Sequence, residues 1–258
     1  MSGTFTPRPG AAPLLRQVRA QTLMEARLLV RNGEQLLLAV VIPLMVLVGG
    51  VLALDRIGLD LGGRRAIDLL TPGVLALAVM STSFTSLAIA TGFERRYGVL
   101  KRLGTAPLPR SGLLTGKVGA LLLVQVLQAV TLVAVALAMG WSPAGGAVGW
   151  GAAAVVAIAG TAAFASLGLL VAGTLRAEAT LAAANLIYLL LLAGGAVVLP
   201  ASTYGGFAPV AAYLPSGALG EGMRGALLDG SLALGPLAVL VAWAALGTVL
   251  TARTFRWE

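Results

Sequence analysis

The chain has 258 residues, of which 58% are hydrophobic and only 11% are charged, and its formal net charge is +8. Ordinary globular domains carry roughly 25% charged residues, so the composition excludes a typical soluble domain. The sequence contains no His and no Cys, which also excludes thiolate nucleophiles, imidazole bases, disulfides and zinc sites built from the usual ligands.

Long stretches without any charged residue define the predicted membrane spans. A bilayer core about 30 Å thick requires about 20 apolar residues in a helix. The longest stretch exceeds one span and is interrupted by turn-forming residues at 141–146, while prolines and glycines at 200–229 argue against a seventh complete helix. We therefore predict an all-α membrane protein with one transmembrane domain over residues 1–258 and six spans at 36–54, 71–91, 118–140, 148–175, 181–199 and 231–252.

The distribution of Lys and Arg predicts the orientation of these spans. The segments before span 1, between spans 2 and 3, between spans 4 and 5, and after span 6 together hold 14 of the 18 basic residues. Short cytoplasmic loops are enriched in Lys and Arg. We therefore expect this side of the protein, and both termini, to be cytoplasmic.

Residues 13–32 form a predicted amphipathic helix before the first span. At 100° per residue its arginines gather on one side and most of its leucines on the other, which is typical of a helix that lies in the lipid headgroups. Glu25 interrupts the apolar side. It has either a cationic partner from another segment or a carboxylate that reaches the membrane surface.

The segment 93–110 carries the most distinctive pattern. As one helix it places Phe93, Tyr97, Leu100 and Leu103 on one side and Glu94, Arg95, Lys101 and Arg102 on the other, and Pro107 and Pro109 end it. These residues alone leave two interpretations open. The segment is either a solvated charge cluster that sets the orientation of the chain, or a helix that lies against lipid or a partner.

This segment resembles the signature loop of the type-2 permeases of ATP-binding-cassette exporters, such as the daunorubicin-resistance permeases. The matching residues are Glu94, Arg95, Gly98, Leu100, Lys101, Arg102, Leu103, Pro107, Leu108 and Pro109, whereas Arg96 and Val99 replace a common acid and a common Thr. A second patch resembles the family's last external loop and contains Pro209, Pro215, Glu221 and Arg224.

The resemblance implies a function for the whole chain. The chain would be the permease of an exporter in the bacterial cytoplasmic membrane, working as a dimer with a second copy or a paralogue. Residues 93–110 would form the coupling helix that contacts a cytoplasmic ATPase subunit, Arg176 and Glu178 a smaller contact, and residues 200–229 an external re-entrant segment. ATP and Mg²⁺ would be bound by the ATPase, because residues 111–118 lack the first Gly and the closing hydroxyl of a phosphate-binding loop. We expect no cofactor, catalytic residue or metal site in this chain, and no nucleic-acid partner.

A few polar residues inside the spans are candidates for the substrate pathway: Ser81, Thr85, Gln125, Gln128, Asn185 and Tyr188. Amides in hydrocarbon need hydrogen-bond partners, so both the Gln125–Gln128 and the Asn185–Tyr188 faces should look into the bundle or a cavity. Their roles are either interhelical bonding or substrate contact. Glu221 and Arg224 can pair at i, i+3 if helical, either as a surface pair or as a gate or hold on lipid headgroups.

Two other functions compete with an ATP-driven exporter. An ion-coupled carrier usually keeps ionisable groups at midplane, and the predicted spans contain no carboxylate or cation. A membrane-embedded enzyme fits less well, because the spans contain no carboxylate cluster for a metal. The mildly polar, uncharged spans suit an amphiphilic or apolar cargo such as a drug, lipid or natural product.

Overall fold

The computed structural model describes residues 12–31, 33–58, 63–103 and 109–255, and these residues form helices and short connections without any strand. The predicted Pro107 lies outside the described residues. Six described helices are long and apolar enough to cross a membrane, which confirms the predicted number and order of spans. They are α2 (Gly33–Ile57), the continuous unit α3–η1–α4, α6 (Arg110–Ala138), α7 (Gly146–Thr174), α8 (Ala177–Gly194) and α11 (Leu234–Thr254).

The second span is the centre of the bundle. It consists of α3 (Ala66–Met80), a π-helical stretch η1 (Ser81–Ser86) and α4 (Leu87–Arg96). Nearly every side chain of α3 is buried, because α2, α6, α7 and α10 (Pro215–Asp229) all pack against it. Leu70, Leu77 and Met80 are among the largest fully buried side chains of the described chain.

Several span boundaries differ from prediction by four residues or more. The second span runs over residues 66–96 rather than 71–91, and the fifth ends at Gly194 instead of residue 199. Hydropathy does not detect the early end, since residues 195–199 are also uncharged. The backbone leaves the helix at Gly195 and Ala196, which has a φ of 53°, and Arg224 then takes the carbonyl oxygens of the segment that follows.

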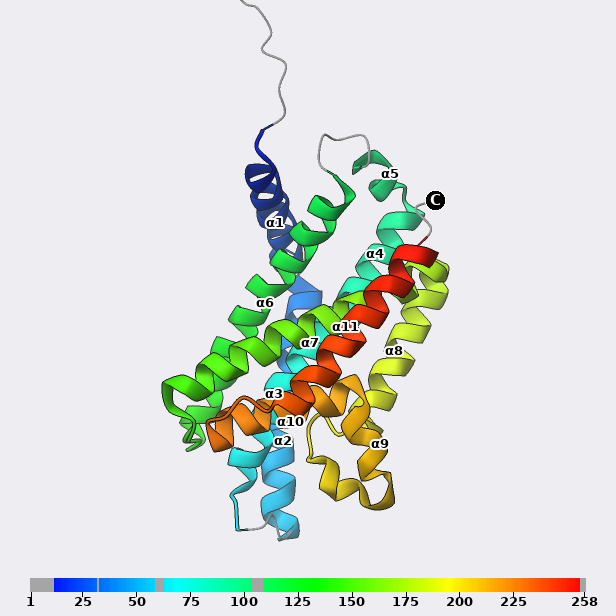
Figure 1. Ribbon diagram of the computed structural model, residues 1–258. Coiled ribbons are helices and arrows are strands. Elements are labelled where there is room, and N and C mark those ends of the chain that lie inside the picture. Colours follow the sequence, from blue (N-terminus) through cyan, green and yellow to red (C-terminus); the bar gives the residue numbers. More distant parts are fainter. Residues whose placement is uncertain (1–11, 32, 59–62, 104–108, 256–258) are drawn as a thin grey trace, which may run out of the picture.

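Most helices that are not candidate spans lie at the two ends of the molecule (Figure 1). α1 (Leu14–Arg31), α5 (Val99–Leu103) and the C-terminal end of α11 lie at one end. At the opposite end lie the 3-10 helix η2 (Ala201–Phe207) and α9 (Ala208–Tyr213), and the following α10 crosses α3 and α7. The segment 200–229, predicted as a re-entrant helical segment, contains these three helices, and its re-entrant character stays a prediction.

The predicted N-terminal helix is present as α1 and packs along α6. Its buried side chains are polar, Gln21 and Glu25, while Leu15 and Leu28 are exposed. Close approach requires glycine in α6, because a Cβ at Gly116 would lie 2.5 Å from Gln21 Cγ. The exposed leucines are what a helix in contact with lipid would present, but its position at the headgroups stays a prediction.

Candidate functional site

The two loops predicted to contact an ATPase lie beside each other at one end of the molecule. The Arg95 guanidinium donates to the carbonyl oxygen of Leu175, and Arg96 forms an ion pair with Glu178. Arg176 is the N-cap residue of α8 and is exposed. The segments 93–103 and 175–178, far apart in the sequence, therefore form one surface, which we call the 97/178 surface after its exposed residues Tyr97 and Glu178.

The predicted continuous helix from Phe93 to Leu103 is wrong. α4 ends at Arg96, and Gly98 adopts a φ of 68° before α5 begins. This left-handed conformation suits glycine after a helix C-terminus, and the Gly98 N–H bonds to the carbonyl oxygen of Arg95. The break changes which side chains face outward from this segment.

The predicted apolar face is divided by this break. Leu100, on the side predicted to lie against lipid or a partner, is buried within its own chain at 3% exposure, so the prediction is wrong for this residue. Tyr97 is 66% exposed, with its ring stacked on Phe93 at 6.2 Å between centroids. Val99 is also exposed, as are Lys101 and Arg102. Leu103 is half-buried, and Pro109 is the N-cap residue of α6.

Behind this surface lies a buried ionic cluster that joins three helices. Lys117 Nζ lies 2.9 Å from Glu25 Oε1 and 2.7 Å from Glu94 Oε1, and the Lys117 side chain is only 4% exposed. Gln21 Nε2 donates to Glu25 Oε1 at 2.8 Å. The cluster Gln21–Glu25–Lys117–Glu94 thus connects α1, α6 and α4.

The cluster answers the question that the sequence left open for Glu25, which has the cationic partner from another segment, so a carboxylate reaching the surface is wrong. Glu94 meets a cation of its own chain, Lys117. Lys117 was missed as a site residue because it was placed just before its span, whereas α6 begins at Arg110 and the candidate span starts at Ser111.

Both glutamines predicted for the substrate pathway form hydrogen bonds to other helices. Gln125 Nε2 donates to Ser83 Oγ at 2.7 Å, and Thr161 Oγ1 donates to Gln125 Oε1 at 2.9 Å. Gln128 Nε2 donates to the Ala39 carbonyl oxygen at 2.8 Å, and Gln128 Oε1 accepts from Thr82 Oγ1 at 2.8 Å. Of the two predicted roles, interhelical bonding is the one these contacts support, as expected for amides in hydrocarbon.

The other pathway candidates have different surroundings. Ser81 and Thr85 are half-buried in η1. Tyr188 is buried in the core, as predicted, but Asn185 is exposed on the described chain, so the expectation that it looks into the bundle is wrong for a single copy. The buried stripe of α8 runs through Ala177, Thr180, Ala184 and Tyr188, and Asn185 falls just outside this stripe.

At the opposite end, Arg224 holds the segment between α8 and η2. Its guanidinium donates to four consecutive carbonyl oxygens, those of residues 196–199, at 3.0–3.3 Å. Glu221 Oε1 accepts from Arg224 Nη2 at 3.1 Å and from the Ala201 N–H at 2.9 Å. We call this arrangement the Arg224 staple.

The staple confirms the predicted Glu221–Arg224 pair but not its surface location, since Arg224 is 4% exposed. Burial lowers the pKa of the Arg224 guanidinium from its ordinary value, and the neighbouring Glu221 carboxylate opposes this shift. Because Arg is essentially always protonated in proteins, the guanidinium stays charged. The two prolines of the predicted patch lie at the starts of α9 and α10, Pro209 exposed and Pro215 buried.

The six helices able to cross a membrane, the polar bonds between them and a basic helical end indicate a polytopic membrane protein. The chain matches the family described as ABC-2 family transporter protein over residues 57–253, most of its length. It belongs to that family, as the sequence resemblance predicted. No curated protein matches the chain. The family implies an ATPase partner and a membrane environment, and it does not favour an ion-coupled carrier.

Proposed function

We propose that this chain is the permease subunit of an ATP-binding-cassette exporter in the bacterial cytoplasmic membrane. ATP and Mg²⁺ would be bound by a separate cytoplasmic ATPase subunit, which would dock on the 97/178 surface. Family membership supports this assignment. So does the gathering of basic side chains at this end, with Lys101 and Arg102 exposed on α5.

The observation that carries the proposal is the linkage of this surface to several spans. α5 follows α4 directly, and the Arg96–Glu178 pair ties α4 to the start of α8. The Glu94–Lys117–Glu25 cluster ties α4 to α6 and α1. Closure of the ATPase pair would therefore move α4, α8, α6 and α1 together. In this proposal Glu94 transmits the movement inside the permease instead of docking the ATPase.

The proposed cargo is amphiphilic or apolar, because the described spans present few charged groups to the membrane interior. The exposed amide of Asn185 supports a dimer. An amide facing hydrocarbon is unfavourable without a partner, and a second permease or a shared cargo pathway would supply one. The segment 200–229, held by the Arg224 staple, would close the external end.

The coupling experiment uses Val99, which is exposed on α5. We expect Val99→Asp to reduce copurification of the cognate ATPase and to abolish ATP-driven uptake into inverted vesicles at unchanged permease abundance. The matched control is Leu232→Asp, an exposed apolar position just before α11, at the end of the molecule opposite α5. Uptake that a proton or sodium gradient drives without the ATPase would instead support the carrier.

Orientation has a separate test in this Cys-free chain. Single cysteines would replace Ser142, in the turn between α6 and α7, and Arg253, near the end of α11; both positions are exposed. We expect an impermeant thiol reagent to label position 142 and not position 253 in intact cells. The reverse pattern would contradict cytoplasmic termini.

A further inference from the structure

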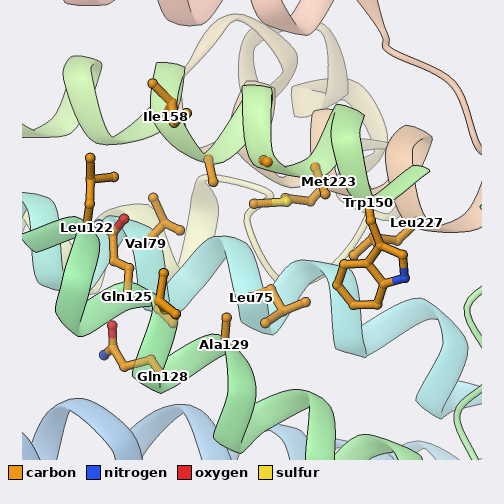
Figure 2. A pocket seen from close by; sticks show the side chains of 15 residues that line it. Leu75, Val79, Leu122, Gln125, Gln128, Ala129, Trp150, Ile158, Met223 and Leu227 are labelled. Carbon is orange, nitrogen blue, oxygen red and sulfur yellow. The ribbon is translucent and has the colours of Figure 1, made fainter. Parts of the chain in front are cut away.

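A crevice of about 400 Å³ opens between α6 and α7. α3 contributes Leu75 and Val79 to its lining, and α10 contributes Met223 and Leu227 (Figure 2). The volume lies within the range of small-molecule sites, roughly 300–1,000 Å³. The α6–α7 crevice is separate from the 97/178 surface and from the Arg224 staple.

The lining of the crevice is apolar apart from two glutamines. Figure 2 shows Gln125 and Gln128 toward one end of the crevice and Trp150 and Leu227 toward the other. Both amides bond to groups on other helices, so mainly their methylene stems are left for an occupant. An apolar cavity of this kind does not favour water.

The crevice opens sideways from the bundle. Val126 of α6 and Ile158 of α7 belong to its lining and are 61% and 57% exposed. Both lie within candidate spans, so the medium outside this opening is hydrocarbon. From Trp150 to Ile158 the lining follows α7 over nine residues, or eight steps of 1.5 Å, which is about 12 Å.

The two ends differ in depth. Trp150 lies near the start of α7, where a span meets the membrane surface, whereas Gln125 and Gln128 lie midway along the span 111–138. Tryptophan is common at that interface, because its ring is apolar and its N–H is polar. The crevice therefore runs from the membrane surface to the middle of the bilayer. An alkyl chain of a lipid in one leaflet covers the same range of depth.

We propose that the α6–α7 crevice binds one extended alkyl chain, which enters from the bilayer with its polar end at Trp150 and its methyl end near Gln125. The chain belongs either to a bilayer phospholipid or to a single-chain amphiphile that is carried as cargo. Binding requires neither the ATPase nor transport, so this inference stands apart from the proposed function.

The test is photolabelling of the purified chain in detergent with palmitic acid that carries a diazirine near its methyl end. We expect saturable labelling of peptides 122–129 and 150–158. Ala154 is exposed and lines the crevice, and Ala154→Phe should weaken labelling about tenfold, as if roughly two methylene groups were no longer buried. Ala154→Leu should weaken it less.

The matched control is Ala134→Phe, an exposed position of α6 outside the crevice, which should leave labelling unchanged. Competition then identifies the source of the chain. Protection by unlabelled phosphatidylethanolamine assigns a bilayer lipid, and protection by palmitic acid alone assigns a single-chain amphiphile. Labelling that rises linearly with probe concentration over all exposed helices overturns the proposal. So does labelling that Ala154→Phe and Ala154→Leu leave as unchanged as the control Ala134→Phe does.

Discussion

In the part of the chain that the structure describes, two buried charge systems each provide partners for a cation, in different ways. The Arg224 staple satisfies one cation mainly with backbone carbonyl oxygens from a single segment. The ionic cluster satisfies Lys117 with two carboxylates from two other helices. A cation bound by consecutive carbonyls fixes one local backbone shape, whereas an ammonium shared between helices fixes how those helices sit relative to one another. The first suits a permanent closure and the second a joint that transmits movement.

The largest expected effect is on the staple. Arg224→Lys keeps the positive charge but loses the planar fork that reaches several acceptors, so most of the carbonyls of 196–199 lose their partner. Breaking a buried polar system in this way costs roughly 3–5 kcal/mol. We expect a much lower midpoint of thermal unfolding in detergent.

Arg64→Lys is the matched control for this substitution. Arg64 pairs with Asp229 at 3.3 Å with both side chains about half exposed, and exposed pairs contribute at most about 1 kcal/mol. Its unfolding midpoint should stay near that of the natural chain. Equal midpoints for the two variants would show that the Arg224 fork is dispensable.

The ionic cluster gives the next effect. Lys117→Met leaves Glu25 and Glu94 facing each other without a cation, which we expect to lower the free energy of unfolding by roughly 3 kcal/mol. The triple variant Glu25→Gln, Glu94→Gln, Lys117→Met removes all three charges and should recover most of this loss. If the triple variant unfolds as easily as Lys117→Met, the loss comes from packing and not from unpaired charge.

Glu94→Gln is a smaller change that separates stability from coupling. The amide oxygen can still accept from Lys117, so we expect a loss of about 1 kcal/mol in the free energy of unfolding. Because the charge that ties α4 to α6 is gone, ATP-driven uptake should fall more than stability does. Transport at the level of the natural chain would show that the cluster serves stability alone.

The smallest effect on stability is expected at the Arg96–Glu178 pair. Both side chains are about half exposed or more, and such pairs contribute at most about 1 kcal/mol. Glu178→Gln should therefore leave the unfolding midpoint nearly unchanged while reducing ATP-stimulated transport. A large drop in the midpoint would show that the pair serves mainly the stability of the permease.

The sequence predicted the features that depend on composition and local spacing. Six spans, the turn at 141–146, the i, i+3 pair of Glu221 and Arg224, and a cationic partner as one option for Glu25 all follow from hydropathy, turn residues and helical periodicity. Features that depend on distant contacts were missed. Nothing near Leu199 in the sequence indicates that Arg224 will take the preceding carbonyl oxygens and end the fifth span early.

The coupling segment shows the same limit on a smaller scale. Helical periodicity from Phe93 to Leu103 predicted one continuous apolar face, because it treats Gly98 as an ordinary helical position. Gly98 instead adopts a left-handed conformation, and Leu100 turns into the chain while Tyr97 stays exposed. Which side chains of this segment are exposed is therefore set by one backbone torsion that helical periodicity does not report.

The π-helical stretch η1 has a consequence for insertions and deletions. A wide turn accommodates one residue more than an α-helical turn, so it offsets α4 from α3 by roughly 100° about the helix axis. Thr82 and Ser83 of η1 face the glutamines of α6, and eleven residues after Ser83 Glu94 faces Lys117 of the same helix. Removing one residue from 81–86 would rotate one of these two sets of contacts away from α6. We therefore expect the second span to tolerate substitutions at 81–86 better than changes in length.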